Sequence, residues 1–163
     1  MVARQGKVAH FGTYGLRDRE KNLPMEQDTI FRIYSMTKAI TSVAALMLEE
    51  EGKLNLNDSI SKYFPSLKKM KVLGRSGLIE PKREVTVADL LRHTSGLTYA
   101  WSSQKEIREA HRDAGVLNRG TKLVPMVHGM SKIPLVFHPG SDWVYGCSTD
   151  VLGGVVEVAS GMP

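Results

Sequence analysis

The sequence predicts an α+β fold made mainly of helices, with a small antiparallel sheet element near the N-terminus. Apolar residues recur at three- and four-residue spacing across residues 36–51 and again across residues 149–160, which indicates two amphipathic helices. A strand-like stretch at residues 8–14 follows the turn signal Gln5-Gly6, which indicates a hairpin. With 42% apolar and 24% charged residues among 163, the chain can form a globular domain with its own core.

The hairpin is expected over residues 1–17, with residues 1–4 as a short strand paired with residues 8–14. Residues 17–27 are polar and contain Asn22 and Pro24, so they are expected to form a loop. This region therefore contributes two strands at most.

The clearest helix is expected over residues 36–51, with Gly52 in the C-cap position. Its apolar residues share one face, which we expect to be buried, and they are Ile40, Val43, Ala44, Met47 and Leu48. The helix matters because a serine and a lysine stand at its N-terminal end.

Further helices are expected in the remainder of the chain, over residues 59–63, 85–91, part of 99–120, 124–132 and 149–160. Asp58 is a suitable N-cap for the first of them, and Gly161 caps the last. Residues 134–140 are expected to be extended and to end in the turn signal Pro139-Gly140.

Bulk properties exclude several classes of function. The net charge of +5 comes largely from a Gly- and Ser-containing loop with Lys68, Lys69, Lys71, Arg75, Lys82 and Arg83. No aromatic residues are interleaved there to stack bases, so the loop is read as a solvated surface and no nucleic-acid partner is predicted. The longest apolar run, residues 39–48, is too short to span a membrane.

The opening residues resemble no signal peptide, and the single cysteine, Cys147, excludes an internal disulfide framework. A reducing, cytoplasmic location is therefore expected.

Ser35-Met36-Thr37-Lys38 is a Ser-x-x-Lys element, a motif that places a nucleophilic serine near a lysine base. If Ser35 opens a helix, Lys38 lies one turn further along the same face. The spacing alone is unspecific, because it also occurs at Ser59/Lys62, Ser66/Lys69 and Ser102/Lys105.

A lysine that acts as a base needs a lowered pKa, and this requirement distinguishes Ser35/Lys38 from the other three Ser-x-x-Lys spacings. Lowering the pKa of a lysine from ~10.4 by about three units costs roughly 4 kcal/mol and requires desolvation or a nearby cation. Only the Ser35 element opens a long apolar helix, where buried neighbours are expected around the lysine. The alternative reading of this element is a helix-capping serine followed by a surface lysine.

Other catalytic motifs are missing from the sequence. It contains no Gly-x-Ser-x-Gly elbow, no His-Glu-x-x-His and no paired Cys/His spacing, so neither an α/β-hydrolase site nor a metal or cofactor site is predicted.

Four segments in order resemble the class C β-lactamase-like members of the penicillin-binding serine hydrolase superfamily, and most of all the family VIII carboxylesterases. They are residues 28–42 around the Ser-x-x-Lys element, residues 51–65, residues 90–97 (Leu-Leu-Arg-His-Thr-Ser-Gly-Leu) and residues 137–145. The resemblance implies that Ser35 is the nucleophile, Lys38 its base and Tyr145 the second acid–base group. It also implies that His93 belongs to a structural turn, and that the helical subdomain lies beside an antiparallel sheet.

Two departures from the family pattern matter. Cys147 stands where lactamases of this type carry an asparagine that contacts substrate, so Cys147 is expected to be a substrate-binding residue. Because a thiol is a weak hydrogen-bonding group, esters are favoured over β-lactams. The family's third motif, on a later strand, is not in the chain. We therefore expect residues 1–163 to be an incomplete domain consisting of the hairpin 1–17, the nucleophile segment 28–52 and the helical part 53–163.

The sequence thus predicts a serine carboxylesterase that acts on small esters through an acyl-enzyme and needs no cofactor. This chain is expected to be inactive alone and to associate with the missing C-terminal part or with itself. The alternatives are a class C-type β-lactamase or D-Ala-D-Ala carboxypeptidase, and, in another class, a non-catalytic structural or binding relative.

Overall fold

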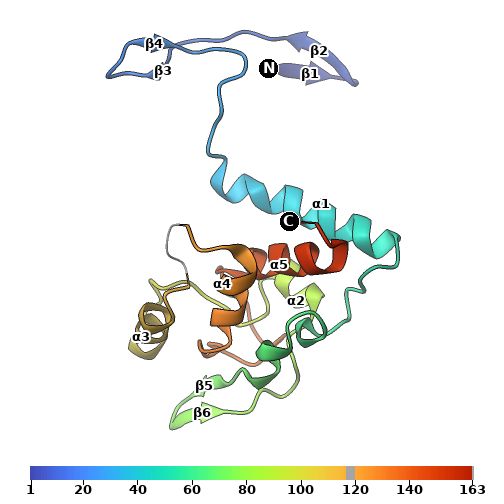
Figure 1. The fold of residues 1–163 in the computed structure, drawn as a ribbon, viewed down its shortest axis with the longest axis vertical. Helices are drawn as coiled ribbons and strands as arrows, with labels where there is room; N and C mark the ends of the chain where they lie inside the picture. The colour runs from blue at the N-terminus through green and yellow to red at the C-terminus, as the bar shows by residue number, and fades with distance from the viewer. Residues whose placement is uncertain (117–119, 163) are drawn as a thin grey trace. The chain divides into compact units, whose positions relative to one another are not determined.

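The computed structural model describes residues 1–116 and 120–162, which form two compact units divided after Ser35. The sequence expectation for residues 99–120 falls partly outside this description, at residues 117–119. Within the described residues, the first unit has two strand hairpins and the second has five α-helices, which can be followed in Figure 1. The predicted combination of helices with small antiparallel sheets is confirmed.

The first unit contains two hairpins. Strands β1 (Val2–Arg4) and β2 (Lys7–His10) are antiparallel and are joined by Gln5 and Gly6, whose φ angles of 50° and 72° suit a tight hairpin turn. The predicted hairpin is therefore present, although its second strand ends at His10. No side chain among residues 1–35 is buried.

A second hairpin occupies the region that the sequence predicted to be a loop. Strand β3 (Leu16–Asp18) pairs with β4 (Leu23–Pro24), and Asn22 takes a positive φ of 51° in the turn between them. A third hairpin, β5 (Val72–Gly74) with β6 (Gly77–Ile79), lies in the basic segment that was also predicted to be a loop. Both predictions were wrong because these strands are short and lack an alternating apolar pattern.

Helix α5 (Ser148–Ser160) is central to the second unit, because it packs against α1 (Thr37–Glu50), α2 (Val87–Arg92) and α4 (Leu123–Met130) (Figure 1). The remaining α-helix, α3 (Lys105–Ala114), contacts α4. Two 3₁₀ helices, Ile60–Lys62 and Pro65–Lys69, precede the β5–β6 hairpin. The core contains completely or almost completely buried side chains, among them Phe64, Leu90, Leu97, Val127, Leu152 and Val155.

Helix α1 begins and ends close to its predicted limits, but its buried face differs from the predicted one. Ala45 and Leu48 are buried, whereas Ile40, Val43 and Met47 are each more than half exposed. The helix carries apolar residues on more than one face, so periodicity alone could not identify the face that packs against α5.

The predicted cap at Gly161 is confirmed, because this residue follows α5 with a positive φ. Thr86 and Asp89 form a capping box at the start of α2, which was not predicted from the sequence. The predicted cap at Asp58 was wrong, because Ser59 is the capping residue and accepts a hydrogen bond from the Ser61 N–H. No helix within residues 1–116 and 120–162 is long and apolar enough to cross a membrane.

Candidate active site

Ser35 lies in a short 3₁₀ turn, Tyr34–Met36, that leads directly into α1. Its side chain is exposed, and the preceding Tyr34 has a positive φ of 46°, which is unusual for a residue other than glycine. Ser35 therefore precedes the helix by one turn residue instead of opening it. Because Ser35 is described with the first unit and Lys38 with the second, their expected proximity stays a prediction.

Lys38 and Tyr145 come together in the second unit, although they are far apart in the sequence. The Lys38 Nζ lies 4.7 Å from the centre of the Tyr145 ring, which is a cation–π distance. Lys38 is half-buried, but its neighbours Ala39 and Ile40 are exposed, so the burial expected around this lysine is only partial. The pairing places the two predicted proton-transfer groups beside each other.

His93 contacts the same tyrosine, a relation that sequence reasoning missed. The two rings stack with centroids 5.0 Å apart and planes 25° from parallel. His93 adopts a left-handed conformation, with φ of 58°, as the C-cap of α2. Burial, together with the positive charge of Lys38, lowers the pKa of His93. We therefore expect a neutral imidazole beside Tyr145 at neutral pH.

Backbone hydrogen bonds join the loop that contains His93 to the segment that contains Tyr145. The Val144 N–H donates to the His93 carbonyl at 3.1 Å, and the Gly140 N–H donates to the Thr94 carbonyl at 2.8 Å. The hydroxyls of Ser95 and Ser148 share a buried hydrogen bond of 2.9 Å. Residues 93–97 therefore form the turn inferred from the resemblance, and this turn helps to position Tyr145.

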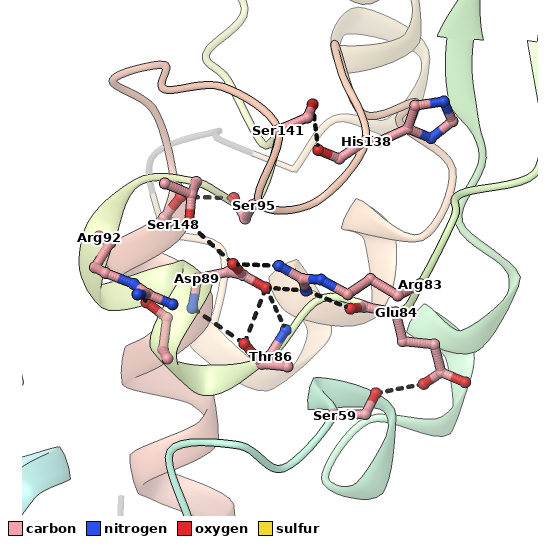
Figure 2. Close-up of polar contacts among 12 residues, drawn as sticks. Ser59, Arg83, Glu84, Thr86, Asp89, Arg92, Ser95, His138, Ser141 and Ser148 are labelled. Carbon is pink, nitrogen blue, oxygen red and sulfur yellow. Dashed lines mark hydrogen bonds and ion pairs between the residues drawn. The ribbon is translucent and has the colours of Figure 1, made fainter.

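A buried carboxylate, that of Asp89, holds the start of this turn (Figure 2). Asp89 is completely buried and accepts hydrogen bonds from the Arg83 guanidinium (2.5 and 2.9 Å), the Thr86 N–H and hydroxyl (both 2.9 Å) and the Thr94 hydroxyl (2.9 Å). Burial raises the pKa of the Asp89 carboxyl, but these bonds outweigh it and bring the pKa to about 2. Asp89 is thus a satisfied buried anion that fixes the start of the turn.

The position of Cys147 corrects one expectation. Its side chain is fully buried, and its thiol donates to the Thr98 carbonyl at 3.2 Å. Burial, with a contribution from the charge of Asp150, raises the pKa of Cys147 to about 12. A side chain so placed does not face a substrate in solution, so Cys147 is not retained as a substrate-contacting residue. Within the described part of the chain, no cluster of His, Cys, Asp or Glu side chains could hold a metal ion.

Known proteins resemble this chain along its entire length. The profile of the Beta-lactamase family matches residues 1–163. Esterase EstB of Burkholderia gladioli is 37% identical over 166 residues, which are 100% of this chain and 41% of the esterase. Acyltransferase calJ of Penicillium decumbens is 35% identical over 140 residues, which are 82% of this chain and 32% of the acyltransferase.

A solved structure agrees with this sequence similarity. EstCE1, described as a hydrolase with promiscuous acyltransferase activity, superposes with a TM-score of 0.83 at 30% identity, covering 99% of this chain and 41% of that one. The chain therefore spans about 40% of the length of EstB and of EstCE1.

Proposed function

The chain belongs to the β-lactamase family, and on this basis we propose that the protein is a serine carboxylesterase that cleaves small esters through an acyl-enzyme. Its α+β fold is part of the β-lactamase/transpeptidase-like fold. The observation that carries the proposal is the position of the Lys38 ammonium over the Tyr145 ring, with Ser35 three residues before the lysine.

In the proposed reaction, the Ser35 Oγ attacks the ester carbonyl and its proton passes to the Lys38–Tyr145 pair. A cation close to a tyrosine favours its phenolate, which can accept that proton. The pair then returns the proton to the departing alcohol, and the acyl group stays on Ser35. Attack by water, activated by the same pair, releases the acid and restores the hydroxyl of Ser35.

Two observations support esters as the substrate class. EstB is named an esterase, and EstCE1 a hydrolase with acyltransferase activity. The runner-up is a class C-type β-lactamase or D-Ala-D-Ala carboxypeptidase, which efficient hydrolysis of a cephalosporin by the whole protein would favour over an esterase. Because the chain spans about 40% of EstB, the activity is proposed for the whole protein.

A second candidate is acyl transfer to an alcohol, which shares the acyl-enzyme and differs only in the final acceptor. The name of acyltransferase calJ and the description of EstCE1 favour it. Adding a primary alcohol during ester cleavage separates the two functions, because a transferase would form the new ester in excess over free acid.

The nucleophile is tested with a serine-reactive phosphonate and peptide mapping of the intact protein. We expect the label on the peptide that contains Ser35, and we expect Ser35→Ala to abolish labelling and to lower ester turnover by several orders of magnitude. Ser59→Ala is the matched control, because Ser59 also begins a Ser-x-x-Lys spacing and caps a 3₁₀ helix. Labelling at any other serine would refute the assignment, and no labelling at all would favour a non-catalytic relative.

The roles of Lys38 and Tyr145 are tested by a double-mutant cycle with Lys38→Ala and Tyr145→Phe. Each single change is expected to remove most of the rate, and the double mutant should lose little more, because groups that act as one unit are not additive. Multiplicative losses would mean that one of the two side chains only packs.

A further inference from the structure

Five aromatic rings form a continuous row through Tyr145. Neighbouring centroids along the row are separated by 4.2 Å (Trp101 to Tyr99), 6.0 Å (Tyr99 to Tyr145), 5.0 Å (Tyr145 to His93) and 6.2 Å (His93 to Trp143). Trp101 is 75% exposed and Trp143 is 60% exposed, so both ends of the row face solvent. The row thus presents π-surface on both sides of the proposed catalytic tyrosine.

The backbone that carries the row is held in place. The carbonyl of Thr98, next to Tyr99, is hydrogen-bonded to the buried His111 ring at 2.9 Å and accepts from the Cys147 thiol. The Tyr99 carbonyl accepts from the Ser102 N–H at 3.1 Å. A backbone held in this way limits where the rings can lie, and a site that is shaped before its ligand arrives loses less conformational freedom on binding.

The charges around the row define the ligand that it suits. An exposed aromatic surface attracts organic cations, but the Lys38 ammonium already lies over the central Tyr145 ring. The Asp150 carboxylate, whose charge acts on both Tyr99 and Lys38, offsets this ammonium, so the row carries no unbalanced charge that would select an ion. The row therefore suits an uncharged planar group. Such a group can stack on the Tyr99–Trp101 pair, whose planes are 24° from parallel.

We propose that this aromatic row is the subsite for an aryl group of the substrate, with Tyr99 and Trp101 as specificity-determining residues. The inference rests on the proposed function, because it makes aromatic esters the preferred substrates of the same site. Stacking on one ring contributes selectivity of about three- to tenfold over a saturated group of the same size.

Binding is tested without catalysis by labelling the protein with 5-fluorotryptophan and recording fluorine NMR spectra. The sequence has two tryptophans, and both lie in the row, so each resonance reports on one end of it. Benzyl alcohol is expected to shift the Trp101 resonance in a saturable way, with an apparent Kd at least threefold lower than that of cyclohexylmethanol. Tyr99→Leu should remove this preference, whereas Tyr14→Leu, which removes an exposed ring outside the row, should not.

The kinetic arm compares benzyl acetate with cyclohexylmethyl acetate, and methyl benzoate with methyl cyclohexanecarboxylate. We expect kcat/KM to favour the aryl ester in at least one pair, and Trp101→Leu to reduce that preference about three- to tenfold. Turnover with no aryl preference, or equal binding of the two alcohols, overturns the subsite and leaves the esterase proposal standing. Selective binding of benzyl alcohol without turnover supports the subsite and counts against the proposed function.

Discussion

Replacing Asp89 by asparagine is expected to lower the free energy of unfolding by about 2–3 kcal/mol at pH 7. Asparagine is nearly isosteric, so the change removes the negative charge without opening a cavity. The Arg83 guanidinium then loses its buried counter-ion, and the new amide N–H₂ group faces other donors from Thr86 and Thr94. Because the Arg83 side chain is partly exposed, water takes over part of its solvation, so the loss lies at or below the lower limit of the roughly 3–5 kcal/mol that a broken buried pair costs.

The magnitude follows from the pKa of Asp89. A folded-state pKa of about 2, against 3.8 for the ordinary carboxyl, corresponds to about 2 kcal/mol of stabilisation in the ionised form. Since the folded-state pKa is lowered, this stabilisation is present above pH 4 and is lost as the pH falls from about 4 towards 2. At pH 3, about half of it should remain.

The assay is urea denaturation at pH 7 and pH 3, followed by far-UV circular dichroism, on the wild type and Asp89→Asn. Asp113→Asn is the matched control, because Asp113 is exposed and its only described ion pair is with the adjacent Arg112. The control should change stability by less than about 0.5 kcal/mol. A difference between wild type and Asp89→Asn that is below 0.5 kcal/mol at pH 7, or equal at both pH values, would refute this account of the buried carboxylate.

Two further sets of changes test the packing around the site. Gly146→Ala should destabilise by about 1–3 kcal/mol, because an added Cβ would lie 2.3 Å from the Leu97 carbonyl oxygen. Gly153 lies inside α5, and a Cβ added there would have its nearest neighbour, an atom of Leu123, at 3.4 Å. Gly153→Ala should therefore stabilise the fold by up to about 1 kcal/mol. Urea denaturation that finds Gly146→Ala more stable than Gly153→Ala would contradict this packing. Cys147 should react with iodoacetamide only after unfolding in urea, because it is buried and its pKa is raised to about 12; rapid alkylation of the folded protein, seen by mass spectrometry, would contradict this.

The local features of the fold were predictable from the sequence because they depend on nearby residues. The limits of α1 and α5 follow from apolar periodicity and from the glycines that end them. The β3–β4 and β5–β6 hairpins were missed, since their strands have two or three residues each and their turns resemble loops. The buried face of α1 depends on which helix packs against it, and this is a tertiary property.

The candidate site likewise has a local part that the sequence shows and a tertiary part that it does not. The Ser35–Lys38 spacing is visible in four residues of sequence, whereas Tyr145 could be connected with it only through the family resemblance. The stacking of His93 on Tyr145 requires two segments about 50 residues apart to meet, and no local pattern indicates it. The burial of Cys147 could have been predicted, because cysteine is among the residue types most often buried and Cys147 stands just before an apolar helix.

The junction between residues 93–98 and residues 136–148 has a consequence for the order in which the protein folds. Its hydrogen bonds join residues about 50 positions apart, such as Ser95 with Ser148, so the intervening chain must close a long loop before they form. The free-energy cost of closing a flexible loop rises by only about 0.6 kcal/mol each time the length of the loop doubles. Insertions at the exposed residues 120–122, between α3 and α4, should therefore change stability little and leave the Lys38–Tyr145 pairing intact. Mutations within the junction should delay the recovery of near-UV circular dichroism from the packed aromatic rings more than they delay the recovery of far-UV helical signal, because the local helices can form before this long-range contact.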